Sequence, residues 1–161
     1  MILEIVVVVL FFLIYIFYEL YFKKYFEVRR VFKTLKSFLN TRDSLVLKIL
    51  PDIKNKALIK EITKLIEERK LNFDSSHNNA ILSDVKLNSK LKIFYDETKK
   101  INKNDVIEEL LNRLVILENS LKKIRLEYNQ KVLDYNNGLI KHKRVLLRII
   151  KMKPLDIYKV Y

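Results

Sequence analysis

The chain opens with one continuous apolar run, and amphipathic segments follow it towards the C-terminus. Between Ile5 and Tyr18 there is no charged side chain, and only Glu4 and Glu19 interrupt the run over residues 1–22. At 1.5 Å rise per residue, about 20 apolar residues cross the roughly 30 Å hydrocarbon core of a bilayer. The pattern therefore predicts a transmembrane anchor over these residues.

A cleaved signal peptide and a buried core helix are the alternative interpretations of this run. A signal peptide needs a basic N-terminal region and small residues at its cleavage site. Here no Lys or Arg precedes the run, and the first Ala of the chain is Ala57. Its C-terminal end is rich in aromatic residues, like the interfacial belt of a membrane helix. These residues are Tyr15, Tyr18, Tyr21 and Phe22. We therefore favour an uncleaved anchor.

Beyond the run, apolar residues recur at intervals of three and four, which is the spacing of one helix face. A first amphipathic segment covers residues 23–50, and Pro51 should end or kink it because proline removes a backbone donor. A second runs from Ile53 to about Lys70. Residues 72–79 (NFDSSHNN) predict a loop, since Asn, Asp and Ser compete with helix through local hydrogen bonds.

The C-terminal half predicts two more helices. One covers residues 80–100, and a polar break follows it. The other starts at Asn104 or Asp105, either of which can cap it, with Glu108 placed to complete a capping box. It carries heptad positions through Leu139. Together these segments predict three to four long helices after the anchor.

Composition supports the helical prediction. The chain has one Gly, two Pro and no Cys, whereas folds with many turns need glycine for positive φ angles. We therefore predict an all-α chain: one N-terminal transmembrane helix followed by an antiparallel bundle of three to four long helices. Its expected parts are an anchor (1–22), a basic juxtamembrane helix (23–42), a cytoplasmic bundle (43–141) and a basic amphipathic tail (142–161).

The last predicted helix has the clearest heptad pattern. Its four-three positions are Ile107, Leu111, Leu114, Glu118, Leu121, Arg125, Tyr128, Val132, Tyr135 and Leu139. Two of them, Glu118 and Arg125, are charged, and charges in a seam cost stability unless they are paired. They lie two turns apart, too far for a close contact along one helix. We therefore expect each to find a partner on a neighbouring helix.

This helix also carries a family resemblance. Its segment ENSLKKIRLEYNQKVLDYNNGL resembles the C-terminal signature of the LemA family. The matching positions are Glu118, Arg125, Tyr128, Asn129, Val132, Tyr135, Asn136 and Leu139. Residues 42–46 (RDSLV) are similar to the Arg-Asp region of that family. The chain departs from the family in having His142-Lys143 where Phe-Pro is usual, and in the late position of Pro51. The resemblance implies a membrane-tethered antiparallel helical bundle whose molecular activity is poorly defined across the family, and it does not imply a catalytic site.

The net charge of +13 is concentrated at the two ends of the body. The candidate membrane-surface residues are Lys23, Lys24, Arg29, Arg30, Lys33, Lys36, Lys141, Arg144, Arg148 and Lys151. Basic residues beside a membrane helix stay on the cytoplasmic side, which predicts an inner-membrane protein with its N-terminus outside. They also attract anionic headgroups. The helical wheel of residues 139–152 is basic on one side and apolar on the other. This segment could lie on the bilayer or pack against residues 28–39, and both remain open.

The sequence offers no catalytic, metal or cofactor motif. His77 and His142 are isolated, and we expect His77 to be a solvated loop residue. A single glycine leaves no phosphate-binding loop, and no nucleic-acid motif is present. The two Tyr-Asn pairs, Tyr128-Asn129 and Tyr135-Asn136, are called the Tyr-Asn seam below. Its tyrosines either bury their rings and hydrogen-bond across the bundle or contribute to a ligand site.

These observations predict a non-enzymatic scaffold that presents a helical bundle at the membrane. Its expected partners are the lipid bilayer with its anionic headgroups, other membrane or cytoplasmic proteins, and a second copy of the chain, but not nucleic acid. The alternative function is a regulatory module that recognises a small ligand or signalling partner through the Tyr-Asn seam.

Overall fold

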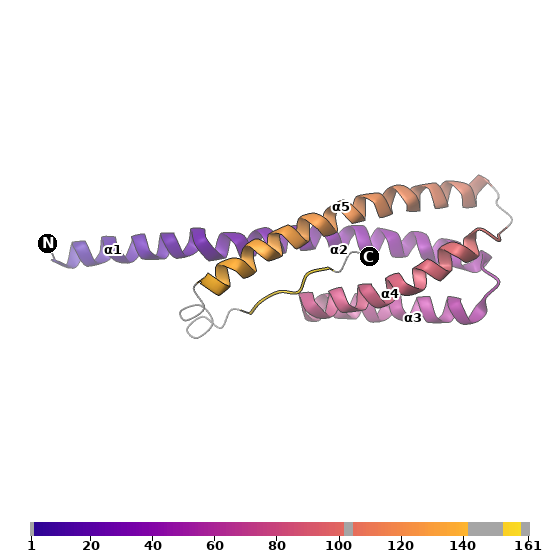
Figure 1. Cartoon of the computed structure of the whole chain (residues 1–161), viewed down its shortest axis with the longest axis horizontal. Coiled ribbons are helices and arrows are strands. Elements are labelled where there is room, and N and C mark those ends of the chain that lie inside the picture. Colours follow the sequence, from indigo (N-terminus) through magenta and orange to yellow (C-terminus); the bar gives the residue numbers. More distant parts are fainter. Residues whose placement is uncertain (1, 102–104, 142–152, 159–161) are drawn as a thin grey trace.

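The computed structural model describes residues 2–101, 105–141 and 153–158, and in these the fold is all-α with no strand. Its elements are α1 (Ile2–Phe17), the π-helical turn η1 (Tyr18–Phe22), α2 (Lys23–Ile49), the 3-10 turn η2 (Leu50–Asp52), α3 (Lys56–Ser75), α4 (His77–Thr98) and α5 (Asp105–Lys141). Figure 1 shows α5 running antiparallel beside α2, while α3 and α4 form a second antiparallel pair. The predicted all-α helical bundle is confirmed.

The N-terminal part of the molecule is a straight helical rod. The backbone stays in the right-handed helical region at Phe17, Phe22 and Lys23, so α1, η1 and α2 continue one another. In Figure 1, α1 projects beyond the bundle. It has 16 residues. Within the described part of the chain, none of the helices meets the combined requirements of length and apolarity for a membrane crossing, so the spanning helix predicted over residues 1–22 is not supported.

Two hydrophobic clusters hold the bundle together. The first lies nearer α1 and joins Val28–Leu39 of α2 to Leu121–Leu139 of α5, with Phe73 at the end of α3. The second lies at the other end and joins Val46–Ile53 to the apolar faces of α3 and α4. Between the two clusters α2 presents Arg42 and Asp43 to the interior. The core is therefore apolar at both ends and charged in its middle.

The loop predicted over residues 72–79 is wrong. Helix α3 continues to Ser75 and α4 starts at His77, so only Ser76 departs from helical geometry, with φ −163° and ψ 156°. The Ser76 hydroxyl accepts a hydrogen bond from the backbone N–H of Asn79 at 3.1 Å and caps α4. Asn72 donates to the Ser83 hydroxyl at 2.5 Å across the helix pair. The polar residues therefore cap and join two helices instead of forming a loop.

The other predicted boundaries agree more closely with the structure. Helix α2 ends at Ile49, directly before the turn that contains Pro51. Asn55 caps α3 by accepting a hydrogen bond from the N–H of Leu58 at 3.1 Å. Helix α5 starts at Asp105, while the other candidate cap, Asn104, lies outside the described residues. Helix α2 passes through the expected division at residues 42 and 43 without a break.

Candidate functional site

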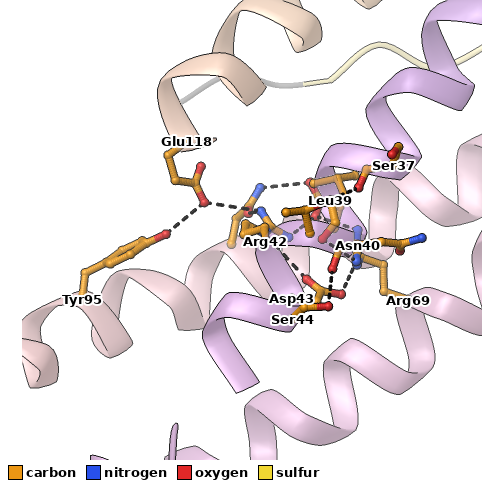
Figure 2. A network of polar contacts seen from close by, with 12 residues as sticks. Ser37, Leu39, Asn40, Arg42, Asp43, Ser44, Arg69, Tyr95 and Glu118 are labelled. Carbon is orange, nitrogen blue, oxygen red and sulfur yellow. Dashed lines mark hydrogen bonds and ion pairs between the residues drawn. The ribbon is translucent and has the colours of Figure 1, made fainter. Parts of the chain in front are cut away.

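Six charged side chains meet between the two apolar clusters and form what we call the buried ion cluster. They are Arg42, Asp43, Arg69, Asp84, Glu118 and Arg125, three positive and three negative. They come from all four helices of the bundle, and Figure 2 shows several of them converging on Arg42. Arg42, Arg69 and Asp84 are fully buried. Since an unpaired buried charge is strongly destabilising, this balance of charge is what permits their burial.

Asp84 of α4 is the centre of the cluster. Its two carboxylate oxygens accept from Arg42 Nη2 at 2.6 Å and from Arg125 Nη2 at 3.0 Å. Burial alone would raise the pKa of Asp84, but Arg42, Arg125 and Arg69 outweigh it and hold the pKa below its usual value. Asn88, one turn further on, accepts from Arg42 Nη1 at 2.7 Å. One acidic side chain of α4 therefore ties α2 and α5 together.

Arg69 and Glu118 extend the cluster to α3 and to the surface of α5. Arg69 donates to the Asp43 carboxylate and, at 3.2 Å, to the carbonyl oxygen of Leu39. Glu118 accepts from the Tyr95 hydroxyl at 2.9 Å (Figure 2). Burial and the Glu118 carboxylate raise the pKa of that hydroxyl. These contacts fix the relative positions of all four helices, which is the best-attested role of buried polar groups.

The expectation for Glu118 and Arg125 is confirmed in its main part, because each has partners on a neighbouring helix. Glu118 contacts Tyr95 of α4, and Arg125 contacts Asp84 of the same helix. The two side chains nevertheless approach each other, with Arg125 Nη1 3.9 Å from Glu118 Oε2. The prediction that they lie too far apart was therefore wrong, since the long guanidinium side chain closes the gap of two turns.

Sequence reasoning missed four members of the buried ion cluster, because Arg42 and Asp43 were noted only for a family resemblance and Arg69 and Asp84 were not noted. The positions of Arg69 and Asp84 nevertheless carried a signal. Arg69 stands three residues after Ile66, and Asp84 stands three residues before Leu87, so each continues an apolar stripe of its helix. A charged residue within such a stripe must be paired or turned outwards.

The Tyr-Asn seam forms the second unusual site. It holds residues 153–158, which we call the C-terminal segment and which have no regular secondary structure. Asn136 accepts from Leu155 N at 3.0 Å and donates to Leu155 O at 2.8 Å. Asn129 likewise accepts from Tyr158 N at 2.7 Å and donates to Tyr158 O at 2.8 Å. Each asparagine therefore satisfies both backbone groups of one residue.

The two tyrosines of the seam complete this arrangement. The Tyr135 hydroxyl donates to Lys153 O at 3.3 Å, and the Tyr128 hydroxyl donates to Asp156 O at 3.4 Å. Both rings are buried in the first apolar cluster, as one of the two interpretations expected. Their hydroxyls, however, reach the backbone of the C-terminal segment and not a neighbouring helix. Val132 and Leu139 of the same signature are buried beside them.

His77 is the first residue of α4 and is not a solvated loop residue, so that prediction was wrong. Its ring lies on Phe32 of α2 with centroids 4.0 Å apart. Burial, assisted by Arg29, lowers the pKa of the imidazole below the usual 6.5. His142 lies outside the described residues.

We expect an NMR titration to place the pKa of His77 below 6.5. The chain has only two histidines, so a His142→Gln variant leaves the His77 imidazole as the single histidine signal. Because the folded pKa is lowered, the unfolded chain takes up its proton first as the pH falls. The stability that neutral His77 provides is complete above pH 6.5 and is lost as the pH falls to the folded pKa. A measured value of 6.5 or higher would contradict the packing on Phe32.

Four of the predicted membrane-surface residues gather around one pocket. Arg29, Arg30, Lys33 and Lys36 line a hollow of about 800 Å³, together with the aromatic side chains of Tyr25, Phe26, Phe32 and Phe73. Lys23 and Lys24 line a smaller pocket of about 350 Å³ that also contains acidic residues. Lys141 ends α5, while Arg144, Arg148 and Lys151 lie outside the described residues, as does most of the basic tail.

Comparison with known proteins adds no assignment to these sites. No protein-family model matches the chain, and no curated protein matches it. In residues 2–101, 105–141 and 153–158, no three His, Asp or Glu side chains gather where they could hold a metal ion. The two sites that the structure defines are thus the buried ion cluster, which joins helices, and the Tyr-Asn seam, which holds an extended backbone.

Proposed function

We propose that this chain is a membrane-tethered scaffold of the LemA type. In this proposal α1 and η1 lie in the inner membrane with the N-terminus outside, and the helical bundle is cytoplasmic. The bundle presents its surface to other membrane or cytoplasmic proteins. The resemblance of α5 to the family signature and the apolar leader both support this function.

The exposure of α1 is the observation that carries the proposal. From Leu3 to Ile16 its apolar side chains are exposed on every side of the helix, for example Phe11 at 69%. A helix that is apolar all round is buried in a protein core or in a membrane, and α1 projects away from the core (Figure 1). The helical path from Ile2 to Phe22, which includes η1, is about 30 Å long, close to the thickness of the hydrocarbon layer.

The pocket lined by Arg29, Arg30, Lys33 and Lys36, called the basic pocket below, supports the proposed orientation with the bundle on the cytoplasmic side. Its Arg and Lys side chains begin at Arg29, seven residues after η1, on the side where positive charge is retained during insertion. In the proposed arrangement they lie near the anionic headgroups, each contributing about 1 kcal/mol of attraction close to the surface. The aromatic side chains that share the pocket suit the same interfacial region.

Alkaline carbonate extraction tests the tether. We expect the full chain to stay in the membrane pellet and protease added from the outside to leave the bundle intact. A Leu10→Glu, Leu13→Glu variant should be released, because each charge near the middle of the membrane costs about 2.5–3.5 kcal/mol.

The matched control for this experiment is Ile116→Glu, which adds a charge at an exposed apolar residue of the bundle and should stay in the pellet. Release of the unmodified chain by carbonate, or digestion of its bundle from the outside, would refute the tether.

A regulatory binding module is the second candidate function. The observation that favours it is the set of hydrogen bonds by which the Tyr-Asn seam holds the backbone at Leu155 and Tyr158. Polar groups arranged in this way recognise a main chain, so the ligand class that they suit best is an extended peptide of a signalling partner.

A further inference from the structure

We propose that the Tyr-Asn seam is a binding site for an extended peptide, and that the C-terminal segment of a second copy of this chain occupies it in exchange for the chain's own. Neighbouring copies would thereby be joined through their C-termini. The proposal rests on the scaffold function in one respect: tethering in the same membrane is what brings the copies together.

The backbone of the C-terminal segment is recognised because the spacing of two asparagines on α5 matches the spacing of two residues in the segment. Asn129 and Asn136 stand seven residues apart on α5, which is about 10.5 Å along the helix axis. Their partners Leu155 and Tyr158 stand three residues apart, and three extended residues span about 10 Å. Four hydrogen bonds of 2.7–3.0 Å result from this agreement. The seam therefore reads a main chain in one register.

Side-chain contacts add sequence selectivity. The Tyr158 ring is buried and meets the Tyr128 ring edge-on at 5.7 Å. The Arg125 guanidinium lies over the Tyr158 ring, 5.7 Å from its centroid. Leu155 packs against the first hydrophobic cluster, the one that joins α2 to α5. A ligand consequently needs an apolar residue three positions before a tyrosine, and Leu155-Asp156-Ile157-Tyr158 of this chain fulfils that need.

The length of the connection makes exchange feasible. Eleven residues, 142–152, stand between the end of α5 and the segment. A chain of that length reaches about 35 Å when extended, whereas Tyr135, which meets Lys153, lies only about 9 Å back along α5 from Lys141. Exchange between copies re-forms identical contacts, so its equilibrium depends on local concentration and on the connection, not on new binding energy.

Complementation between two full-length variants tests the exchange. One carries Asn129→Ala with Asn136→Ala and keeps its segment. The other carries Leu155→Ala with Tyr158→Ala and keeps its seam. Each alone, reconstituted in lipid vesicles, should be monomeric by chemical crosslinking, while the two variants in the same vesicles should give a 1:1 dimer. A mixture that remains monomeric, with both variants folded by circular dichroism, would overturn the proposal.

A second measurement avoids these substitutions. A photoreactive phenylalanine analogue in place of Ile157, which is 43% exposed, leaves Leu155 and Tyr158 unchanged. Illumination of membranes that contain two differently tagged copies should yield a covalent dimer, and excess synthetic peptide KPLDIYKVY should reduce its yield. If crosslinks formed only within single copies, the seam would bind only the segment of its own chain, and the proposed exchange would be wrong.

The same membranes are also extracted with carbonate. Protein that stays in the pellet without forming dimers overturns the exchange alone, whereas protein that forms dimers but is released overturns the tether alone.

Discussion

Replacing Asp84 with alanine is expected to destabilise the bundle by about 3–5 kcal/mol, because it breaks a buried charge pair by removing one partner. The carboxylate of Asp84 hydrogen-bonds both Arg42 and Arg125 inside the core. Without it, the buried guanidinium of Arg42 loses its closest counter-ion. Urea denaturation followed by circular dichroism measures the loss, and a chain that no longer folds at 25 °C would agree with the upper end of the range.

Asp96→Ala is the matched control for this experiment. Asp96 lies on the same helix, but its side chain is 69% exposed and its partner Lys99 is a surface residue. Its replacement should leave the free energy of unfolding nearly unchanged, since exposed ion pairs contribute little. Equal effects of the two substitutions would mean that the buried ion cluster contributes no more than a surface pair.

Phe32→Ala is expected to cost about 3–5 kcal/mol, the range for removing a large aromatic side chain from a core. Phe32 is 7% exposed, and its ring lies between those of Phe73, His77 and Tyr128, with centroid distances of 5.6, 4.0 and 5.8 Å. The substitution removes apolar contacts to α3, α4 and α5 at once. Thermal and urea unfolding measure the effect.

Phe26→Ala is the matched control, because Phe26 is a phenylalanine of the same helix, α2, and is 50% exposed. It should change the free energy of unfolding far less, because half of its surface is already exposed. The Phe32 variant should also bring the pKa of His77 back towards 6.5, since the ring that covers the imidazole is gone. A Phe32 variant as stable as the Phe26 variant would contradict the packing.

Periodicity was sufficient to predict the helices but not every helix end. The apolar spacing in α2 and α5 is long and regular, so these two helices were predicted over nearly all the residues that the structure describes as helical there. The segment around Ser76 failed because its Asn, Asp and Ser residues predict a loop by composition, whereas one of them caps a helix and another joins two helices. Whether such a residue ends a helix or caps the next one depends on tertiary contacts that composition does not contain.

The two sites were predictable to different degrees. Glu118 and Arg125 stood out because a charge in an apolar seam demands a partner, although the partner Asp84 could not be named from spacing along α5. The role of Asn129 and Asn136 could not be predicted, since their partners Leu155 and Tyr158 lie in a short extended segment without a period. Helix patterns identify a face, but only the folded chain shows which distant backbone lies against it.

The unbroken rod of α1, η1 and α2 has a mechanical consequence. The backbone keeps right-handed helical geometry through the π-helical turn η1, and α2 extends about 40 Å beyond it. In a chain held by α1 in lipid, a change of about 10° in helix tilt, as a thinner or thicker bilayer would impose, would move Ile49 sideways by about 7 Å. In the proposed tethered arrangement, the far end of α2 would therefore shift when the bilayer changes thickness.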